Sequence, residues 1–111
     1  MIMLPSGLKV FVLNEPVNMH KSFDGLAALA QTEFKKNALN GDLFVFFNRP
    51  CDKVKVLQFD RTGFSIWYKR LEKGRFRLPK MQQKVYTLSI SDFNLLLEGI
   101  DLVYRRHVSA I

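Results

Sequence analysis

Apolar positions along the chain alternate between short continuous runs and a helical spacing, which predicts strands and helices in turn. Residues 8–13 (LKVFVL) form an apolar run between Gly and Pro residues, which is typical of a strand. Apolar residues then recur at spacings of three and four, which predicts a helix capped by Asn18, with Lys35 and Lys36 in its last turn. The buried stripe of this helix is expected to consist of Met19, Phe23, Leu26, Ala27, Ala30 and Phe34.

Four further runs predict the remaining strands. Residues 43–47 (LFVFF) are continuously apolar between turn signals, which indicates a central strand. Residues 53–59 and 64–71 flank the turn sequence DRTG and are expected to form a hairpin. Residues 85–90 (VYTLSI) are the last predicted strand.

A short helix is expected to follow this strand. Ser91 would cap the helix and Gly99 would end it. Its apolar stripe is made of Phe93, Leu96 and Leu97. The order β, α, β, β, β, β, α predicts one α+β domain over all 111 residues. We expect a mainly antiparallel sheet of about five strands, with a central basic hairpin and both helices packed on one face.

The predicted hairpin leaves two registers open. Asp at the first position of DRTG and Gly at the fourth favour a type I turn with a left-handed glycine bulge. Direct pairing across the turn would place Lys53 opposite Arg70. A pairing shifted by one residue would instead place Lys55 opposite Lys69. Both registers gather like charges at the end of the hairpin away from the turn, which destabilises a sheet unless an anion offsets them.

The positive charge of the chain is concentrated in one segment. The chain has 17 Lys or Arg residues and 10 acids, a net charge of +7. Residues 49–84 hold eleven of the basic residues and three of the acids, a balance of +8, so the rest of the chain carries −1. Such localisation is the electrostatic pattern expected of a protein that binds nucleic acid or another polyanion. A solvated basic surface without a partner is the alternative.

Catalytic and metal chemistry are not indicated. Cys51 is the only cysteine, and the two histidines, His20 and His107, are far apart, so neither a disulfide nor a zinc site is expected. His20 and Asp24 are spaced for one helical turn, which suits either an acid–base pair or a plain surface hydrogen bond. No glycine-rich phosphate loop or dinucleotide fingerprint is present. We therefore expect no enzymatic activity, no cofactor and no metal.

The location of the protein is predicted from what the sequence lacks. No apolar run approaches the roughly 18 residues that span a bilayer. The first residues also lack the basic start and long apolar stretch of a signal peptide. We therefore expect a cytoplasmic protein without a membrane partner.

The candidate binding residues lie on the predicted hairpin and on the segment after it. Phosphate contacts are expected from Lys53, Lys55, Lys69, Arg70, Lys73, Arg75 and Arg77. Tyr68 is a candidate for stacking on a nucleobase, and Glu72 would orient Arg70 or Arg75. The pattern does not choose among duplex DNA, single strands and RNA, and an acidic protein face would suit the same charges.

Several segments resemble a known family of mobile-element proteins. The stretches MHKSFDGLAAL, GDLFVFFNR, DKVKVLQFDRTGFSIWYKRLEKGRF and LLEGID occur in that order. They are similar to the TnpB accessory protein, the second open reading frame product, of the insertion-sequence-sixty-six family of bacterial transposable elements. The resemblance covers about residues 4–101 and includes Arg49. His20 stands where the family usually has arginine, which weakens any phosphate site at the start of the first helix.

The resemblance implies a protein that is encoded beside a separate transposase and is needed for efficient transposition, with no catalytic activity of its own. Its implied partners are the DNA of the element ends, the transposase and the other accessory protein of the same element. We therefore expect a non-enzymatic accessory factor that binds DNA through the hairpin and the following loop. The alternative is an adaptor that docks on the transposase without contacting DNA.

Overall fold

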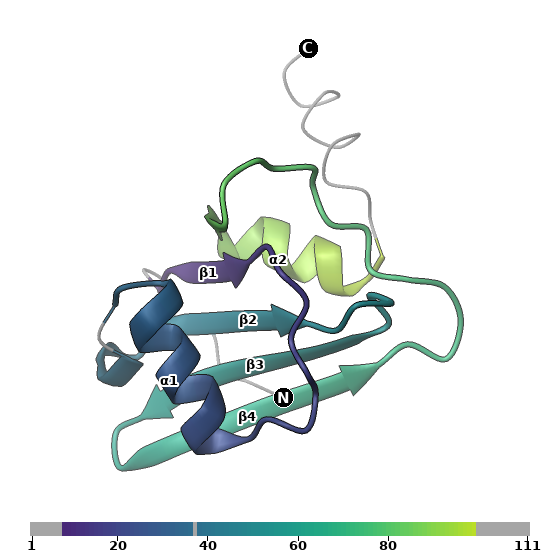
Figure 1. Ribbon diagram of the computed structural model, residues 1–111. Helices are drawn as coiled ribbons and strands as arrows, with labels where there is room; N and C mark the ends of the chain where they lie inside the picture. Colours follow the sequence, from purple (N-terminus) through teal and green to yellow (C-terminus); the bar gives the residue numbers. More distant parts are fainter. Residues whose placement is uncertain (1–7, 37, 100–111) are drawn as a thin grey trace.

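The computed structural model describes residues 8–36 and 38–99, which form a mixed sheet of five strands with helices on both sides (Figure 1). The elements are β1 (Val10–Leu13), α1 (Phe23–Glu33), the 3-10 turn η1 (Ala38–Asn40), β2 (Leu43–Phe47), β3 (Lys53–Asp60), β4 (Gly63–Arg70), β5 (Val85–Leu88) and α2 (Ile90–Leu97). The predicted α+β class and all five predicted strands are confirmed. Within the described residues, no helix has the length and apolar character needed to cross a membrane.

The sheet has the strand order β4-β3-β2-β1-β5. β2 is the middle strand, as predicted, and all five of its residues are buried, which explains its continuous apolar run. It pairs parallel with β1 and antiparallel with β3, and the other two pairings are antiparallel. The basic hairpin β3–β4 lies at one edge of the sheet, so its predicted central position is wrong.

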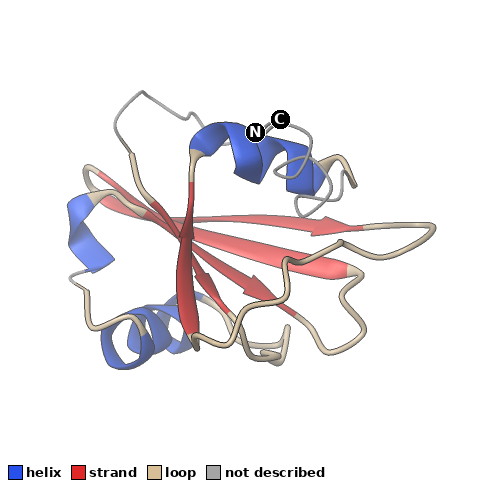
Figure 2. Ribbon diagram, turned by 90° about the horizontal axis from the view of Figure 1, so that it is seen from above, coloured by secondary structure: helices blue, strands red, loops and turns tan. Residues whose placement is uncertain are grey.

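The two helices cover opposite faces of the sheet, and the prediction that both pack on one face is wrong (Figure 2). Leu26 and Ala30 of α1 pack against Phe44 on one face. Phe93 of α2 packs with Val45 on the other face. Because neighbouring residues of a strand point to opposite sides, the unbroken apolar run of β2 needs cover on both faces.

The first helix begins later than predicted. The prediction that Asn18 caps it is wrong, because the N-cap position is Ser22, whose side chain makes no capping hydrogen bond. Asn18 Oδ1 instead accepts a hydrogen bond from the His20 backbone N–H at 2.8 Å. Phe23 is 46% exposed rather than buried, and the last turn carries no basic residue. Residues 14–22 therefore form a non-helical approach segment before α1.

The second helix begins one position before the predicted cap. Ser89, not Ser91, is the N-cap, and its Oγ accepts a hydrogen bond from the Asp92 backbone N–H at 3.0 Å. All three residues of the predicted apolar stripe are buried. Gly99 has a φ of +87° just past the helix, so its predicted role as the helix stop is confirmed.

Candidate nucleic-acid interface

The β3–β4 hairpin adopts the direct register of the two that the sequence allows. Lys53 pairs with Arg70, and Asp60 pairs with Gly63 across the turn. The predicted glycine bulge is wrong, because Gly63 already belongs to β4 and the left-handed residue is Arg61, with a φ of +55°. The shifted register, which would have placed two lysines opposite each other, does not occur.

Strand pairing sorts the predicted cations onto two faces of the hairpin. Lys53, Lys55 and Arg70 share the face that α1 covers, since cross-strand partners point to the same side. Lys69 points to the other face, where its Nζ donates a hydrogen bond of 3.3 Å to the Leu97 carbonyl at the end of α2. A cation is favoured there by the helix dipole. The expected single stripe of four hairpin cations is therefore divided.

Lys55 is not positioned to contact phosphate, contrary to the prediction. The residue is only 8% exposed, and its Nζ donates hydrogen bonds to the carbonyls of Met19 at 2.5 Å and Lys21 at 2.8 Å. The same Nζ lies 4.7 Å from the centre of the Tyr68 ring. These three contacts offset the cost of burying the ammonium group. Lys55 therefore ties the approach segment to the hairpin.

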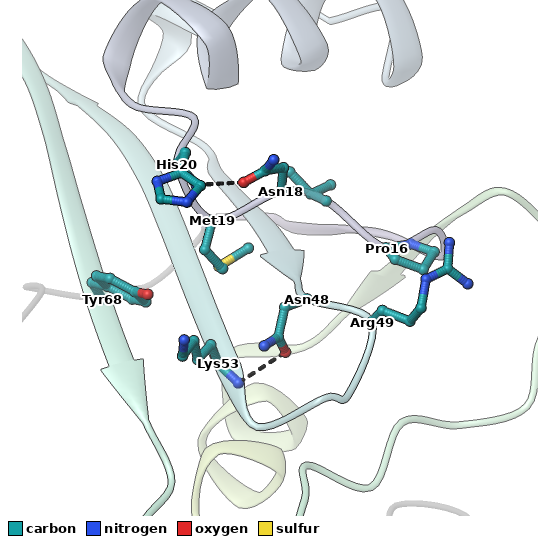
Figure 3. Close-up of a pocket in the computed structure, with 9 residues that line it drawn as sticks. Pro16, Asn18, Met19, His20, Asn48, Arg49, Lys53 and Tyr68 are labelled. Carbon is teal, nitrogen blue, oxygen red and sulfur yellow. Dashed lines mark hydrogen bonds between the residues drawn. The ribbon is translucent and has the colours of Figure 1, made fainter.

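An open groove of about 630 Å³ lies between the approach segment and the hairpin (Figure 3). The side chains that matter chemically come from the approach segment, the β2–β3 turn, β3 and β4, and they are Asn18, Met19, His20, Arg49, Lys53 and Tyr68. Figure 3 shows Tyr68 and Arg49 toward opposite ends of the groove. The groove thus combines cationic, hydrogen-bonding and aromatic side chains on one concave surface.

The turn between β2 and β3 places Arg49 at the groove. Asn48 Oδ1 accepts hydrogen bonds from the backbone N–H groups of Asp52 at 3.1 Å and Lys53 at 3.0 Å. Its Nδ2 donates to Asp52 Oδ1 at 2.6 Å, so both the oxygen and the nitrogen of the amide shape the turn. Arg49 and His20 line the groove, but they were not among the residues predicted to contact nucleic acid. The family resemblance could have pointed to them, because both residues fall inside its matching stretches.

Residues 71–80 form a basic loop that folds back onto the end of the sheet. The backbone N–H groups of Leu71 and Phe76 donate hydrogen bonds of 2.7 Å to the carbonyls of Asp52 and Cys51, respectively. Phe76 is buried and packs edge-on against Phe47, with ring centres 5.5 Å apart. The cations of this loop that were predicted to bind phosphate are all exposed, and they are Lys73, Arg75 and Arg77.

Glu72 at the start of the basic loop pairs with Arg70. Its Oε1 lies 3.1 Å from Arg70 Nη2, which matches one of the two predicted partners. The hydrogen bond and the charge of Glu72 raise the pKa of Arg70. Both side chains are well exposed, so the pair contributes little to stability. It does reduce the positive charge that Arg70 presents beside the groove.

The described residues do not bring together the candidate catalytic pair or a cluster of metal ligands. His20 precedes α1, so the helical spacing assumed for His20 and Asp24 does not exist. Burial raises the pKa of the Cys51 thiol despite the opposing effect of Arg75. The raised pKa favours the protonated thiol, which is less nucleophilic than the thiolate. No group of three His, Cys, Asp or Glu side chains in residues 8–36 and 38–99 could hold a metal ion. His107 lies outside the described residues.

The fold and the groove define a small basic α+β domain with a charged hairpin at the sheet edge. The chain matches the family described as IS66 Orf2 like protein (TnpB_IS66) over residues 8–107, and it belongs to this family. The resemblance noted in the sequence is thereby confirmed. Membership implies an accessory role in transposition, and it favours a non-catalytic protein.

Two relatives come from Sinorhizobium fredii (strain NBRC 101917 / NGR234). The uncharacterized protein y4jC is 32% identical over 95 residues, which cover 86% of this chain and 81% of that protein. The uncharacterized protein y4hO is 37% identical over 101 residues, which cover 89% of this chain and 88% of that protein. No solved structure matches the chain significantly.

Proposed function

We propose that this protein is a non-enzymatic accessory factor that binds the DNA of its transposable element through the cations around the groove and on the basic loop. The observation that supports this proposal is the position of the excess charge. Arg49 and Lys53 line the groove, and Arg70 pairs with Lys53 across the same hairpin. The exposed cations of the basic loop follow directly after β4.

Backbone anchoring makes these cations suitable for phosphate contacts. The basic loop is held by two hydrogen bonds and by the burial of Phe76, and the Arg49 turn is held by Asn48. Side chains on a fixed backbone lose less conformational entropy on binding than side chains on a disordered tail. Each phosphate neutralised also releases condensed counterions from DNA, which makes the affinity depend strongly on salt.

The proposal is tested by measuring binding of the purified protein to element-end DNA and to unrelated DNA over a salt series. We expect log affinity to fall with log salt by roughly 0.9 per phosphate contact. The double substitution Arg75→Ala and Arg77→Ala should flatten this slope by about one to two units. Arg61→Gln is a control for the loss of a cation elsewhere, since Arg61 lies in the turn between β3 and β4. Absent binding, or an affinity that does not change with salt, would contradict the proposal.

A protein-interaction adaptor is the second candidate, and the position of β4 favours it. β4 is one of the two edge strands of the described sheet, the other being β5, and its outer side offers backbone groups to a partner strand. Such an adaptor would capture the transposase in a pull-down and fail to shift DNA. The Arg75→Ala and Arg77→Ala protein should then lose the transposase rather than DNA.

A further inference from the structure

We infer that the groove receives an unpaired nucleotide, whose base stacks on Tyr68 while the flanking phosphates contact Arg49 and Lys53. The inference rests on the proposed DNA-binding function and names the form of DNA that the groove takes. It concerns a single-stranded segment or an extruded base, rather than a base inside a duplex.

Tyr68 provides a fixed aromatic surface at the groove. It is 49% exposed, although large aromatic side chains usually bury most of their surface. Lys55 Nζ lies 4.7 Å from its ring centre and is itself held by the Met19 and Lys21 carbonyls. The ring is therefore supported from beneath by a buried cation. An aromatic side chain held in this way loses little further entropy when a base stacks on it.

The neighbouring aromatic residue of β4 differs from Tyr68 in its surroundings. Trp67 points to the opposite face and is partly buried against the α2 core. Tyr68 instead lines the groove together with Arg49 and Lys53. An aromatic ring beside cations is the combination that single-strand binding proteins use, because every base has a face for stacking and every linkage carries a charge.

The form of the groove favours an unpaired nucleotide over a duplex. The groove is open to solvent, and its volume of about 630 Å³ lies within the usual range for small-molecule sites. In a duplex the base faces are covered by their stacked neighbours, so the ring of Tyr68 would reach them only after a base leaves the stack. His20 lines the same groove and supplies ring nitrogens for the edge of a base.

The walls of the groove are fixed before any ligand binds. The Val17 backbone N–H donates a hydrogen bond of 2.8 Å to the Phe47 carbonyl, and Val17 is buried. Lys55 holds the same approach segment at Met19 and Lys21. A preformed concave site of this kind spends little binding energy on ordering itself.

The inference is tested by fluorescence anisotropy with the full chain, an oligothymidine single strand and a duplex of equal length at one salt concentration. We expect the single strand to bind more tightly than the duplex. Tyr68→Ala should weaken single-strand binding by roughly five- to 150-fold, the range for removing one stacking aromatic, and should change duplex binding much less. Tyr68→Phe keeps the ring and should recover most of that loss. Phe23→Ala removes an equally exposed aromatic outside the groove and is the matched control.

A second measurement needs no variant. A single 2-aminopurine placed in the oligothymidine strand should lose fluorescence on binding the unmodified protein, because stacking on an aromatic ring quenches it. Equal affinity for single strand and duplex, unchanged 2-aminopurine fluorescence in the bound strand, or a Tyr68→Ala protein that binds like the unmodified one would each overturn the inference and leave the proposed DNA binding intact. Binding to neither form of DNA would overturn both.

Discussion

Lys53 and Lys55 lie two residues apart on the same face of β3, yet Lys53 belongs to the solvent-accessible groove and Lys55 to the protein interior. Lys53 lines the groove and is partly exposed, whereas Lys55 is buried beneath Tyr68 with two backbone carbonyls as acceptors. The difference arises from the approach segment, which passes over Lys55. A lysine in a basic segment therefore serves as a ligand contact or as an internal tie, depending on which chain segment covers it.

Lys69 extends this comparison to the other face of the hairpin. Its Nζ donates to the Leu97 carbonyl at the end of α2, so it too has a structural acceptor. Two of the four hairpin cations are thus engaged with backbone carbonyls. The formal charge of residues 49–84 therefore overstates the charge that this segment offers to a polyanion. The groove-lining cations Arg49 and Lys53 indicate a binding surface better than the net charge of the segment does.

The largest expected effect is that of replacing Lys55, whose ammonium group links the approach segment to the hairpin. Lys55→Met keeps the apolar stem and removes both charge-assisted hydrogen bonds and the contact with the Tyr68 ring. We expect the free energy of unfolding to fall by about 2–4 kcal/mol, since hydrogen bonds to charged groups contribute about 1.5–3 kcal/mol each and such effects are not additive. Urea denaturation followed by circular dichroism measures the change.

Lys53→Met is the matched control for this substitution. It makes the same chemical change on the same face of the same strand, and we expect it to alter stability by less than about 0.5 kcal/mol, as for most surface substitutions. Equal losses for the two variants would show that the burial of Lys55 has no structural role.

A smaller effect is expected on the opposite face. Lys69→Met removes one hydrogen bond of 3.3 Å and a favourable charge at the end of α2. We expect a loss of about 1 kcal/mol, which combines a modest hydrogen bond with a helix-dipole interaction of about 0.3–1 kcal/mol. Because this charge interaction is screened by salt, the loss should shrink when denaturation is repeated at high salt. If Lys69→Met lowered the free energy of unfolding as much as Lys55→Met, the buried Lys55 would stabilise the fold no more than Lys69 does.

The parts of the fold that the sequence predicts are those decided by local pattern. The apolar run of β2, the hairpin around DRTG and the stripe of α2 each depend on neighbours within a few residues, and each is confirmed. The placement of helices on both faces was also available in principle, because β2 is apolar at every position and so needs cover on both sides. A single covered face would leave part of the apolar run of β2 in contact with water.

The start of α1 shows why the rest was missed. Met19 and Phe23 fit a helical spacing, but the approach segment donates a hydrogen bond from Val17 to Phe47 and gives two carbonyls to Lys55. Contacts between segments about 30 residues apart thus override a local preference. The same contacts create the groove and bury Lys55, so the error in the helix and the error in the binding residues have one cause.

The smallest expected effect tests the charge that Arg70 presents beside Lys53. Glu72→Gln removes the carboxylate that pairs with Arg70, and because both side chains are well exposed, stability should change by less than about 0.5 kcal/mol. DNA binding should respond in the opposite direction. Removing an anion next to the groove strengthens attraction to phosphate and frees Arg70 for a contact of its own, so the salt dependence should steepen by about 0.9. Anisotropy over a salt series measures the slope, and a weaker affinity in the Glu72→Gln protein would mean that Glu72 orients Arg70 for binding rather than competing with phosphate for it.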